Sequence, residues 1–218
     1  MSTFAVVTPS RGLVHSRTVE AVMAAIAQAT AAGHEFRGWL LTHDLPIPDC
    51  HEKAAELGLA TGAEALWFVE EDVIPPAGAL CALLERPEPI SIVDYPVGEE
   101  PTVNCAYHLA GEIHWCGLGC TLIRREVFDQ LPRPWFRSDI TFTLKGGQIA
   151  DLWLDRPKPY GGQDIYFCWT ARQAGIAIGE VPGLLCDHAR LRELGASHVN
   201  AGQHRIELLT AANVEHWV

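Results

Sequence analysis

Short apolar runs alternate with helix-like patterns through the first part of the chain. Continuous apolar runs are typical of strands that are buried on both faces of a parallel sheet. The predicted strands cover residues 4–7, 38–41, 65–69 and 90–93. Apolar side chains at helical spacing, with Gly33 closing the first helix, predict helices over residues 18–32, 51–59 and 77–84. Strands that alternate with helices in this way predict an α/β layered fold.

The second half has a different pattern, in which hairpins replace the regular alternation. Hairpins are predicted over residues 103–115 and 141–154, the second turning at Gly146-Gly147. Further helices are predicted over residues 124–131, 164–173 and 203–212. Further strands are predicted over residues 176–179 and 183–188. No repeat, low-complexity tract or linker divides the chain, so residues 1–218 are predicted to form one domain.

The composition restricts the classes of function. The 218 residues include 16 Lys and Arg against 27 Asp and Glu, and the formal net charge of −11 disfavours DNA as a partner. The 7 cysteines include no CxxC pair, which favours a reducing, cytoplasmic compartment over a zinc ribbon or a disulfide framework. No apolar stretch is long enough to span a bilayer, and no basic segment precedes the first apolar run, so neither a membrane anchor nor a signal peptide is expected.

Three acidic residues follow the most apolar of the predicted strands. Glu70, Glu71 and Asp72 lie where that strand ends, and α/β proteins bind ligands at this end of the sheet. If extended backbone continues through them, Glu70 and Asp72 point to one side and Glu71 to the other. Two converging carboxylates repel each other unless a cation such as Mg²⁺ or Mn²⁺ holds them together. The alternative is an acidic helix N-terminus, which the helix dipole favours.

Two further positions are candidates for chemistry. Asp164 follows Gly161-Gly162-Gln163 at the start of a predicted helix, where a role as N-cap would by itself explain an aspartate. His188 ends the last apolar strand, and a single histidine in such a place is more often a packed residue than a ligand. Neither position identifies a function by itself.

Taken in order, these motifs resemble those of the GT-A nucleotide-sugar glycosyltransferases, family 2 in particular. The resemblance extends from Phe4 to about His188 and rests on four motifs. They are the Glu70-Glu71-Asp72 segment, similar to a DxD motif; Gly117-Leu118-Gly119, similar to the glycine loop of the donor-sugar pocket; Gly162-Gln163-Asp164, similar to an xED motif; and His188, similar to the C-terminal metal-binding histidine.

The resemblance implies a fold and an activity. The implied fold is a GT-A-like α/β/α sandwich of Rossmann type with a mixed, mostly parallel central sheet. Residues 1–100 would form its nucleotide-binding half, 101–188 its acceptor half and 189–218 a C-terminal tail. The implied activity is transfer of a sugar, with a UDP-sugar as the expected donor, to a hydroxyl of an acceptor that the sequence does not identify. A glycan, a small molecule, a protein and a modified DNA base all remain open as acceptors.

The resemblance also assigns roles to residues. Asp72, His188 and Glu70 are the expected ligands of Mn²⁺ or Mg²⁺, although the family has Asp where this chain has Glu70. Asp164 is the expected general base, which implies inversion at the sugar carbon. The expected nucleotide-sugar contacts are Thr8, Pro9, Arg11, Lys53, Glu70, Glu71, Asp72, Gly117 and Gly119. The expected acceptor contacts are Trp115, Asp164 and Gln163, which replaces the family's Glu. Arg190 and Arg192 are candidates for phosphate contacts or, equally, for solvent-exposed residues of the tail.

Two other classes of function remain open at this point. A nucleotidyltransferase of similar layered fold would also use carboxylates and Mg²⁺, but Pro9-Ser10-Arg11-Gly12 is a poor version of its glycine-rich basic loop. A catalytically silent nucleotide-sugar-binding module is compatible with Glu70 and Gln163. P-loop ATPases and GxGxxG dehydrogenases are disfavoured, since neither motif occurs in the chain.

Overall fold

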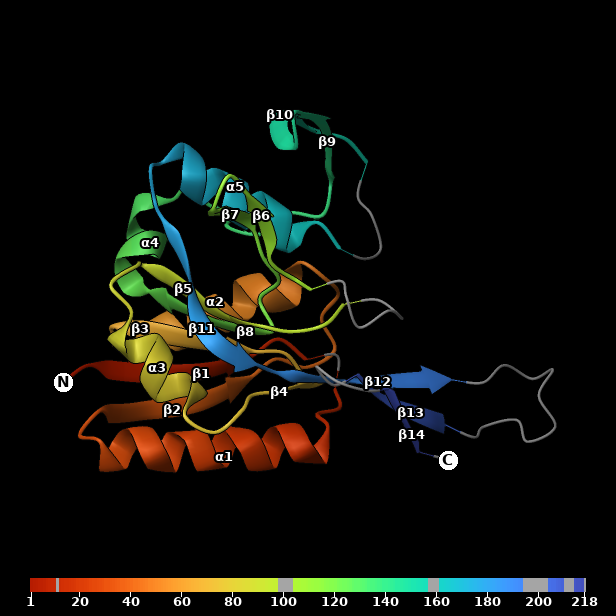
Figure 1. Cartoon of the computed structure of the whole chain (residues 1–218). Helices are drawn as coiled ribbons and strands as arrows, with labels where there is room; N and C mark the ends of the chain where they lie inside the picture. Colours follow the sequence, from red (N-terminus) through yellow and green to blue (C-terminus); the bar gives the residue numbers. More distant parts are fainter. Residues whose placement is uncertain (11, 98–103, 157–160, 194–203, 210–213, 218) are drawn as a thin grey trace, which may run out of the picture.

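The centre of the molecule is a mixed, mostly parallel sheet of six strands (Figure 1). The computed structural model describes the chain apart from residues 11, 98–103, 157–160, 194–203, 210–213 and 218. In the order of the sheet, the strands are β11 (Ile178–Leu185), β5 (Ile90–Asp94), β8 (Cys120–Arg124), β3 (Ala65–Val69), β1 (Thr3–Thr8) and β2 (Glu35–Leu41). Only β8 runs antiparallel to its neighbours in this sheet. The predicted fold class is confirmed.

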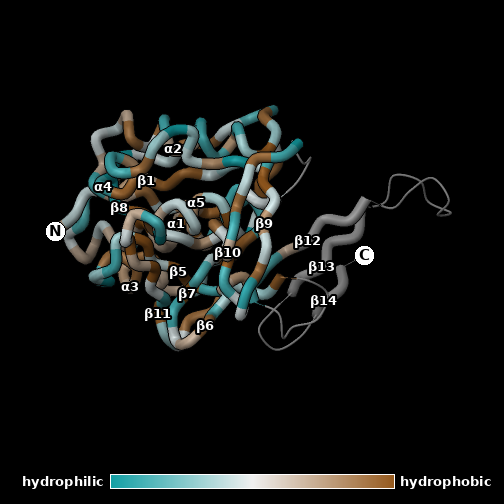
Figure 2. Tube along the Cα trace, turned by 90° about the horizontal axis from the view of Figure 1, so that it is seen from above, coloured by the Kyte–Doolittle hydropathy of each residue, from teal (hydrophilic) through white to brown (hydrophobic). Residues whose placement is uncertain are grey.

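Helices cover both faces of this sheet. Helices α1 (Ser16–Ala31) and α3 (Ala79–Glu85) contact each other on one face. Figure 1 shows the other three on the opposite face: α2 (Asp49–Ala60), α4 (Arg125–Gln130) and α5 (Gln163–Gln173). These five helices of the described chain lie within two residues of their predicted bounds. Strands β3 and β5 are buried throughout, and Figure 2, which looks down through the layers, shows apolar stretches in the part of the molecule where the central strands lie.

The close approach of α2 to the sheet depends on a glycine. All five residues of β3 are buried, as its uninterrupted apolar sequence predicts. A Cβ atom at Gly58 would lie 2.8 Å from side-chain carbons of both Leu66 and Val7. Because Gly58 has no side chain, α2 packs directly on β1 and β3, and this packing fixes the position of its N-terminus at the carboxyl ends of these strands.

Two hairpins extend from the second half of the molecule, as the sequence predicts. The first pairs β6 (Tyr107–Leu109) with β7 (Glu112–Trp115), and the second pairs β9 (Ile140–Lys145) with β10 (Gln148–Leu154). Both lie on the same side of the central sheet as α5 (Figure 1).

The C-terminal part of the chain corrects one prediction. The helix expected over residues 203–212 is wrong, because β13 (His204–Leu209) occupies its described part. This strand belongs to a second sheet of order β14-β13-β12-β4, with β14 (Val214–Trp217), β12 (Asp187–Glu193) and β4 (Val73–Ile74). Backbone pairing of β13 with β12 on one side and β14 on the other overrides the local helical pattern.

Candidate active site

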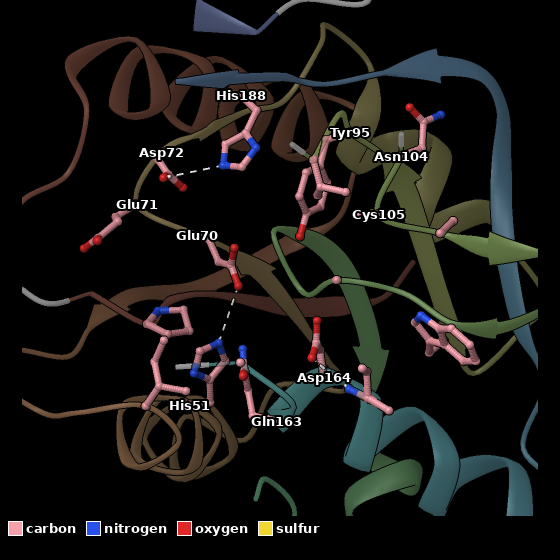
Figure 3. A pocket seen from close by; sticks show the side chains of 18 of the residues that line it. His51, Glu70, Glu71, Asp72, Tyr95, Asn104, Cys105, Gln163, Asp164 and His188 are labelled. Carbon is pink, nitrogen blue, oxygen red and sulfur yellow. Dashed lines mark hydrogen bonds and ion pairs between the residues drawn. The ribbon is translucent and has the colours of Figure 1, made fainter. Parts of the chain in front are cut away.

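A cavity of about 550 Å³ lies where β1 and β3 end and where α2 and α5 begin (Figure 3). Its size is within the usual range of small-molecule sites. The expected residues Pro9, Glu70, Glu71, Asp72, Trp115, Gly117, Gln163, Asp164 and His188 all line it. The cavity therefore gathers side chains from both halves of the chain at the ligand-binding end of the sheet.

The acidic segment turns instead of continuing the strand. Strand β3 ends at Val69, and the Val73 N–H donates to the Glu70 carbonyl at 3.3 Å across the turn. The expected alternation, with Glu70 and Asp72 on one side, is therefore wrong. Each carboxylate has its own partner: Glu71 accepts a hydrogen bond from the Ser10 hydroxyl at 2.9 Å, while Glu70 and Asp72 point in different directions (Figure 3).

Asp72 faces His188. The Oδ2 atom of Asp72 lies 3.5 Å from Nε2 of His188. The His188 Nδ1 lies 2.8 Å from the Pro96 carbonyl oxygen, which can only accept, so Nδ1 carries the hydrogen and Nε2 is directed at Asp72. Burial lowers the pKa of His188, but the hydrogen bond and the charge of Asp72 outweigh it and raise the pKa above its usual value.

Backbone contacts hold this pair together. Strand β12 pairs antiparallel with β4, so that His188 lies opposite Val73. The Ala189 N–H donates to the Asp72 carbonyl at 2.7 Å. Two segments more than a hundred residues apart in sequence are thus joined at the point where the two side chains meet.

Glu70 pairs with a residue that the sequence analysis missed. Its Oε1 lies 3.5 Å from Nε2 of His51, which stands in the first turn of α2 and is 2 % exposed. Burial lowers the pKa of His51, but its contact with Cys50 and the nearby negative charge of Glu70 outweigh this and raise the pKa to about 9. Nothing in the spacing of the sequence distinguishes His51 from an ordinary helical histidine, since only the packing of α2 directs it into the cavity.

The turn of Glu70 toward His51 reduces the expected metal site from three residues to two. Among the residues that the structure describes, no group of three or more His, Cys, Asp or Glu side chains is placed to hold a metal ion. The pair of Asp72 and His188 remains, with one carboxylate oxygen and one imidazole nitrogen 3.5 Å apart.

Asp164 lies at the beginning of α5. Gly162 takes the N-cap position with a φ of 90°, so Asp164 is not the N-cap but stands one residue inside the helix. Its Oδ1 accepts a hydrogen bond from the Ile165 N–H at 2.8 Å. Burial raises the pKa of Asp164 to about 6, with the negative charge of Glu70 adding to the rise and the Ile165 N–H opposing it. A carboxylate with this pKa is suited to accept a proton near neutral pH.

The Tyr95 side chain leaves no room for side chains in the glycine loop of Gly117 and Gly119. A Cβ atom at Gly117 would overlap the Tyr95 hydroxyl, and one at Gly119 would lie 2.6 Å from a Val73 methyl carbon. The Gly119 N–H donates to the Tyr95 hydroxyl at 3.2 Å. Gly117 borders the cavity, whereas Gly119 is not among the lining residues.

An aromatic wall closes the side of the cavity toward the hairpins. Trp115 stacks on Tyr107 with ring centroids 4.0 Å apart and an interplanar angle of 7°. The ring centroid of Phe142 in β9 lies 6.5 Å from that of Trp115. Flat apolar faces of this kind suit the face of a sugar ring or of a base.

Other expected contacts lie elsewhere. The Thr8 hydroxyl is buried and accepts a hydrogen bond from the Trp39 indole at 2.9 Å, away from the cavity lining. Lys53 is exposed on α2 and pairs with Glu56 at 3.3 Å, so its expected contact with a nucleotide has no support in the geometry. Arg11 lies outside the described residues, as do the side chains of Arg190 and Arg192.

Acidic side chains predominate in the described lining of the cavity. Its described lining contains the carboxylates of Glu70, Glu71, Asp72 and Asp164 but neither lysine nor arginine. The described basic groups in this lining are the imidazoles of His51 and His188, and each faces a carboxylate. The described lining thus holds more carboxylates than basic side chains.

Comparisons with known proteins bear on the fold. Neither a scan against protein-family models nor a search of curated protein sequences finds a match. Among solved structures, A197 from STIV is similar with a TM-score of 0.58 and 19% identity over 86% of this chain and 85% of that one. A Drosophila β1,4-galactosyltransferase 7 mutant, crystallised with manganese, UDP-Gal and xylobiose, is similar with a TM-score of 0.50 and 14% identity. That match covers 84% of this chain and 66% of the galactosyltransferase.

These likenesses extend over 86% and 84% of this chain. The chain has a GT-A-type fold, as the resemblance of its motifs implies. Within the described residues, we find no helix that is both long enough and apolar enough to cross a membrane.

Proposed function

We propose that this chain is a divalent-metal-dependent glycosyltransferase, which transfers a sugar from a nucleoside-diphosphate sugar to an acceptor hydroxyl with inversion. The observation that carries the proposal is the meeting of Asp72 and His188, with 3.5 Å between carboxylate oxygen and imidazole nitrogen. The galactosyltransferase of the same fold, crystallised with manganese and UDP-Gal, supports the proposal by likeness only.

The residues present fit a metal ion. The hydrogen bond from His188 Nδ1 to the Pro96 carbonyl is the outer contact that typically orients a metal-binding imidazole. One carboxylate and one imidazole leave most coordination positions to phosphate oxygens and water, as is common for Mn²⁺ and Mg²⁺ at nucleotides. The nitrogen ligand favours Mn²⁺ over Mg²⁺. A bound ion would supply positive charge that stabilises a leaving diphosphate, in a described cavity lining without lysine or arginine.

Asp164 then has the role of general base. The acceptor oxygen forms a bond to the anomeric carbon, the bond from that carbon to the diphosphate oxygen breaks, and Asp164 takes the acceptor's proton. Direct attack of this kind inverts the configuration at the carbon. The aromatic wall of Trp115 and Tyr107 offers a surface for the acceptor, beside Gln163 and Asp164 in the same cavity.

The test is metal-dependent donor binding and hydrolysis. With Mn²⁺ present, UDP-glucose or UDP-galactose should bind and be slowly hydrolysed without acceptor, and EDTA should remove both effects. The variants Asp72→Ala and His188→Ala should each weaken Mn²⁺-dependent binding about tenfold or more in titration calorimetry. The exposed residues Asp129 and His43 provide matched controls, Asp129→Ala and His43→Ala, which should bind like the wild type.

Two outcomes contradict the proposal. Binding that is equally strong in EDTA would show that no metal is needed. Binding without any turnover would favour the silent binding module, with which Glu70 and Gln163 are compatible.

A further inference from the structure

Two residues that line the cavity each carry a buried polar atom without a hydrogen bond. Among the described residues, five buried side-chain nitrogen or oxygen atoms make no hydrogen bond, and two of them, His51 Nε2 and Gln163 Oε1, belong to residues that line the candidate active site. Buried polar atoms nearly always have a partner. Two such atoms in one cavity therefore indicate groups that a ligand satisfies.

The His51 ring is held so that Nε2 points into the cavity. Its Nδ1 lies 3.2 Å from the Cys50 sulfur, and the ring packs against Phe136 at a centroid distance of 5.7 Å. The distance of 3.5 Å to Glu70 is longer than a charge-assisted hydrogen bond of about 2.7–2.9 Å. His51 and Glu70 thus balance each other's charge while leaving Nε2 available to a third group.

Gln163 supplies the opposite kind of atom. It is the first residue of α5 and is 6 % exposed, and its Oε1 is an acceptor without a donor among the described residues. Figure 3 shows Gln163 and His51 on the same side of the cavity, below Glu70 and away from the pair of Asp72 and His188. We call the side chains of His51, Glu70 and Gln163 the polar floor. Together they offer one hydrogen-bond donor and several hydrogen-bond acceptors.

We propose that the polar floor recognises hydroxyl groups on a sugar ring of the donor. The His51 Nε2–H donates to a hydroxyl oxygen, and Gln163 Oε1 and the Glu70 carboxylate accept hydroxyl hydrogens. A hydroxyl is both donor and acceptor and is neutral, which suits a floor where the histidine charge is already balanced. A phosphate has no hydrogens to offer Gln163 and Glu70, so it fits this position poorly. The proposal rests on the proposed function, because it assumes a sugar nucleotide in the cavity.

Two rings of the donor carry such hydroxyls: the ribose and the transferred sugar. The neighbouring position of Asp164 favours the transferred sugar, since the base must lie near its anomeric carbon. Both rings present hydroxyl groups to the polar floor, so ligands that contain only one of the two rings distinguish between them.

The first experiment requires no ligand. Gln163→Met keeps the length of the side chain and removes the unsatisfied oxygen, so the ligand-free variant should melt at the wild-type temperature or higher. A clearly lower Tm would show that the oxygen has a structural partner and would overturn the proposal for Gln163.

The second experiment measures donor binding with Mn²⁺ for His51→Met and for His51→Gln, which keeps an N–H donor. His51→Met should weaken binding of UDP-glucose and UDP-galactose about tenfold, and His51→Gln should restore most of it. Recovery by glutamine separates recognition of a hydroxyl from simple loss of packing.

The comparison ligands identify the ring. If UDP alone loses affinity for His51→Met while 2′-deoxy-UDP binds wild type and variant equally, the ribose is recognised. If UDP is unaffected and only the UDP-sugars lose affinity, the transferred sugar is recognised. Equal binding of every ligand to wild type and His51→Met overturns the proposal for His51.

If the wild type binds none of these ligands with Mn²⁺, the proposed function fails, and the Tm of Gln163→Met still decides whether the polar floor holds an unsatisfied atom.

Discussion

Burial of Asp164 disfavours the ionised form that its proposed role as a base requires. Burial of its carboxyl group raises the pKa from 3.8 in the unfolded chain to about 6 in the native state. The native state therefore holds this proton more tightly than the unfolded chain does. Ionisation of Asp164 costs stability, and the cost grows as the pH rises from about 4 to about 6 and stays constant above it.

Replacing Asp164 by Asn should therefore separate stability from activity. Asp164→Asn removes the buried charge, and we expect the Tm at pH 7 to rise by roughly 2–6 °C. Turnover should fall by about 10²–10⁴-fold, because the amide cannot accept the acceptor's proton. Donor binding with Mn²⁺ should be retained. Calorimetric melting and steady-state kinetics measure both effects, and near-normal kcat in this variant would exclude Asp164 as the base.

The same pKa predicts the pH dependence of transfer. The base acts in its ionised form, so kcat/KM should rise about tenfold per pH unit below the pKa of about 6 and level off above it. Rates measured between pH 4.5 and about 8 with one donor and constant Mn²⁺ test this. A profile that is flat through pH 6 would contradict the role of Asp164.

At the scale of elements, the glycine loop between β7 and β8 and the Tyr95 side chain depend on each other. Gly117→Ala places a methyl group on the Tyr95 hydroxyl, so we expect a loss of about 1–3 kcal/mol in the free energy of unfolding. Tyr95→Phe removes the overlapping oxygen, and the double variant should recover part of this loss in urea unfolding. Additive losses in the double variant would show that the two residues do not clash.

The junction of β4 and β12 positions the two proposed metal ligands. Ala189→Pro removes the N–H that donates to the Asp72 carbonyl at 2.7 Å. We expect Mn²⁺ affinity to fall about tenfold or more, because Asp72 and His188 lose their common anchor. Ala189→Gly keeps the N–H and serves as the control in titration calorimetry. Equal Mn²⁺ affinity in both variants would show that this hydrogen bond does not position the site.

At the scale of the whole molecule, charge restricts the partners. The net charge of −11 and the absence of Lys and Arg from the described cavity lining both disfavour a nucleic-acid acceptor. We expect the dissociation constant for duplex DNA at physiological salt to be weaker than about 10⁻⁴ M in fluorescence anisotropy. Micromolar binding would instead support a DNA-base acceptor.

The sequence by itself determined the fold class and most elements. The uninterrupted apolar run of β3 can only be buried, and helical spacing with terminal glycines places the helices, because these signals are local. The resemblance of the motifs also implied that Asp72 and His188 lie close together, and their nearest side-chain atoms are 3.5 Å apart. Their role as metal ligands stays a prediction.

Tertiary structure alone decided which acidic side chain has which partner. The turn after Val69 separates Glu70 from Asp72, and the close packing of α2, through Gly58, on β1 and β3 brings His51 to Glu70. Residues 204–209 form a strand because β12 and β14 pair with them, against their local pattern. Contacts between distant segments depend on side-chain direction and packing in three dimensions, which no local pattern of apolar and polar residues contains.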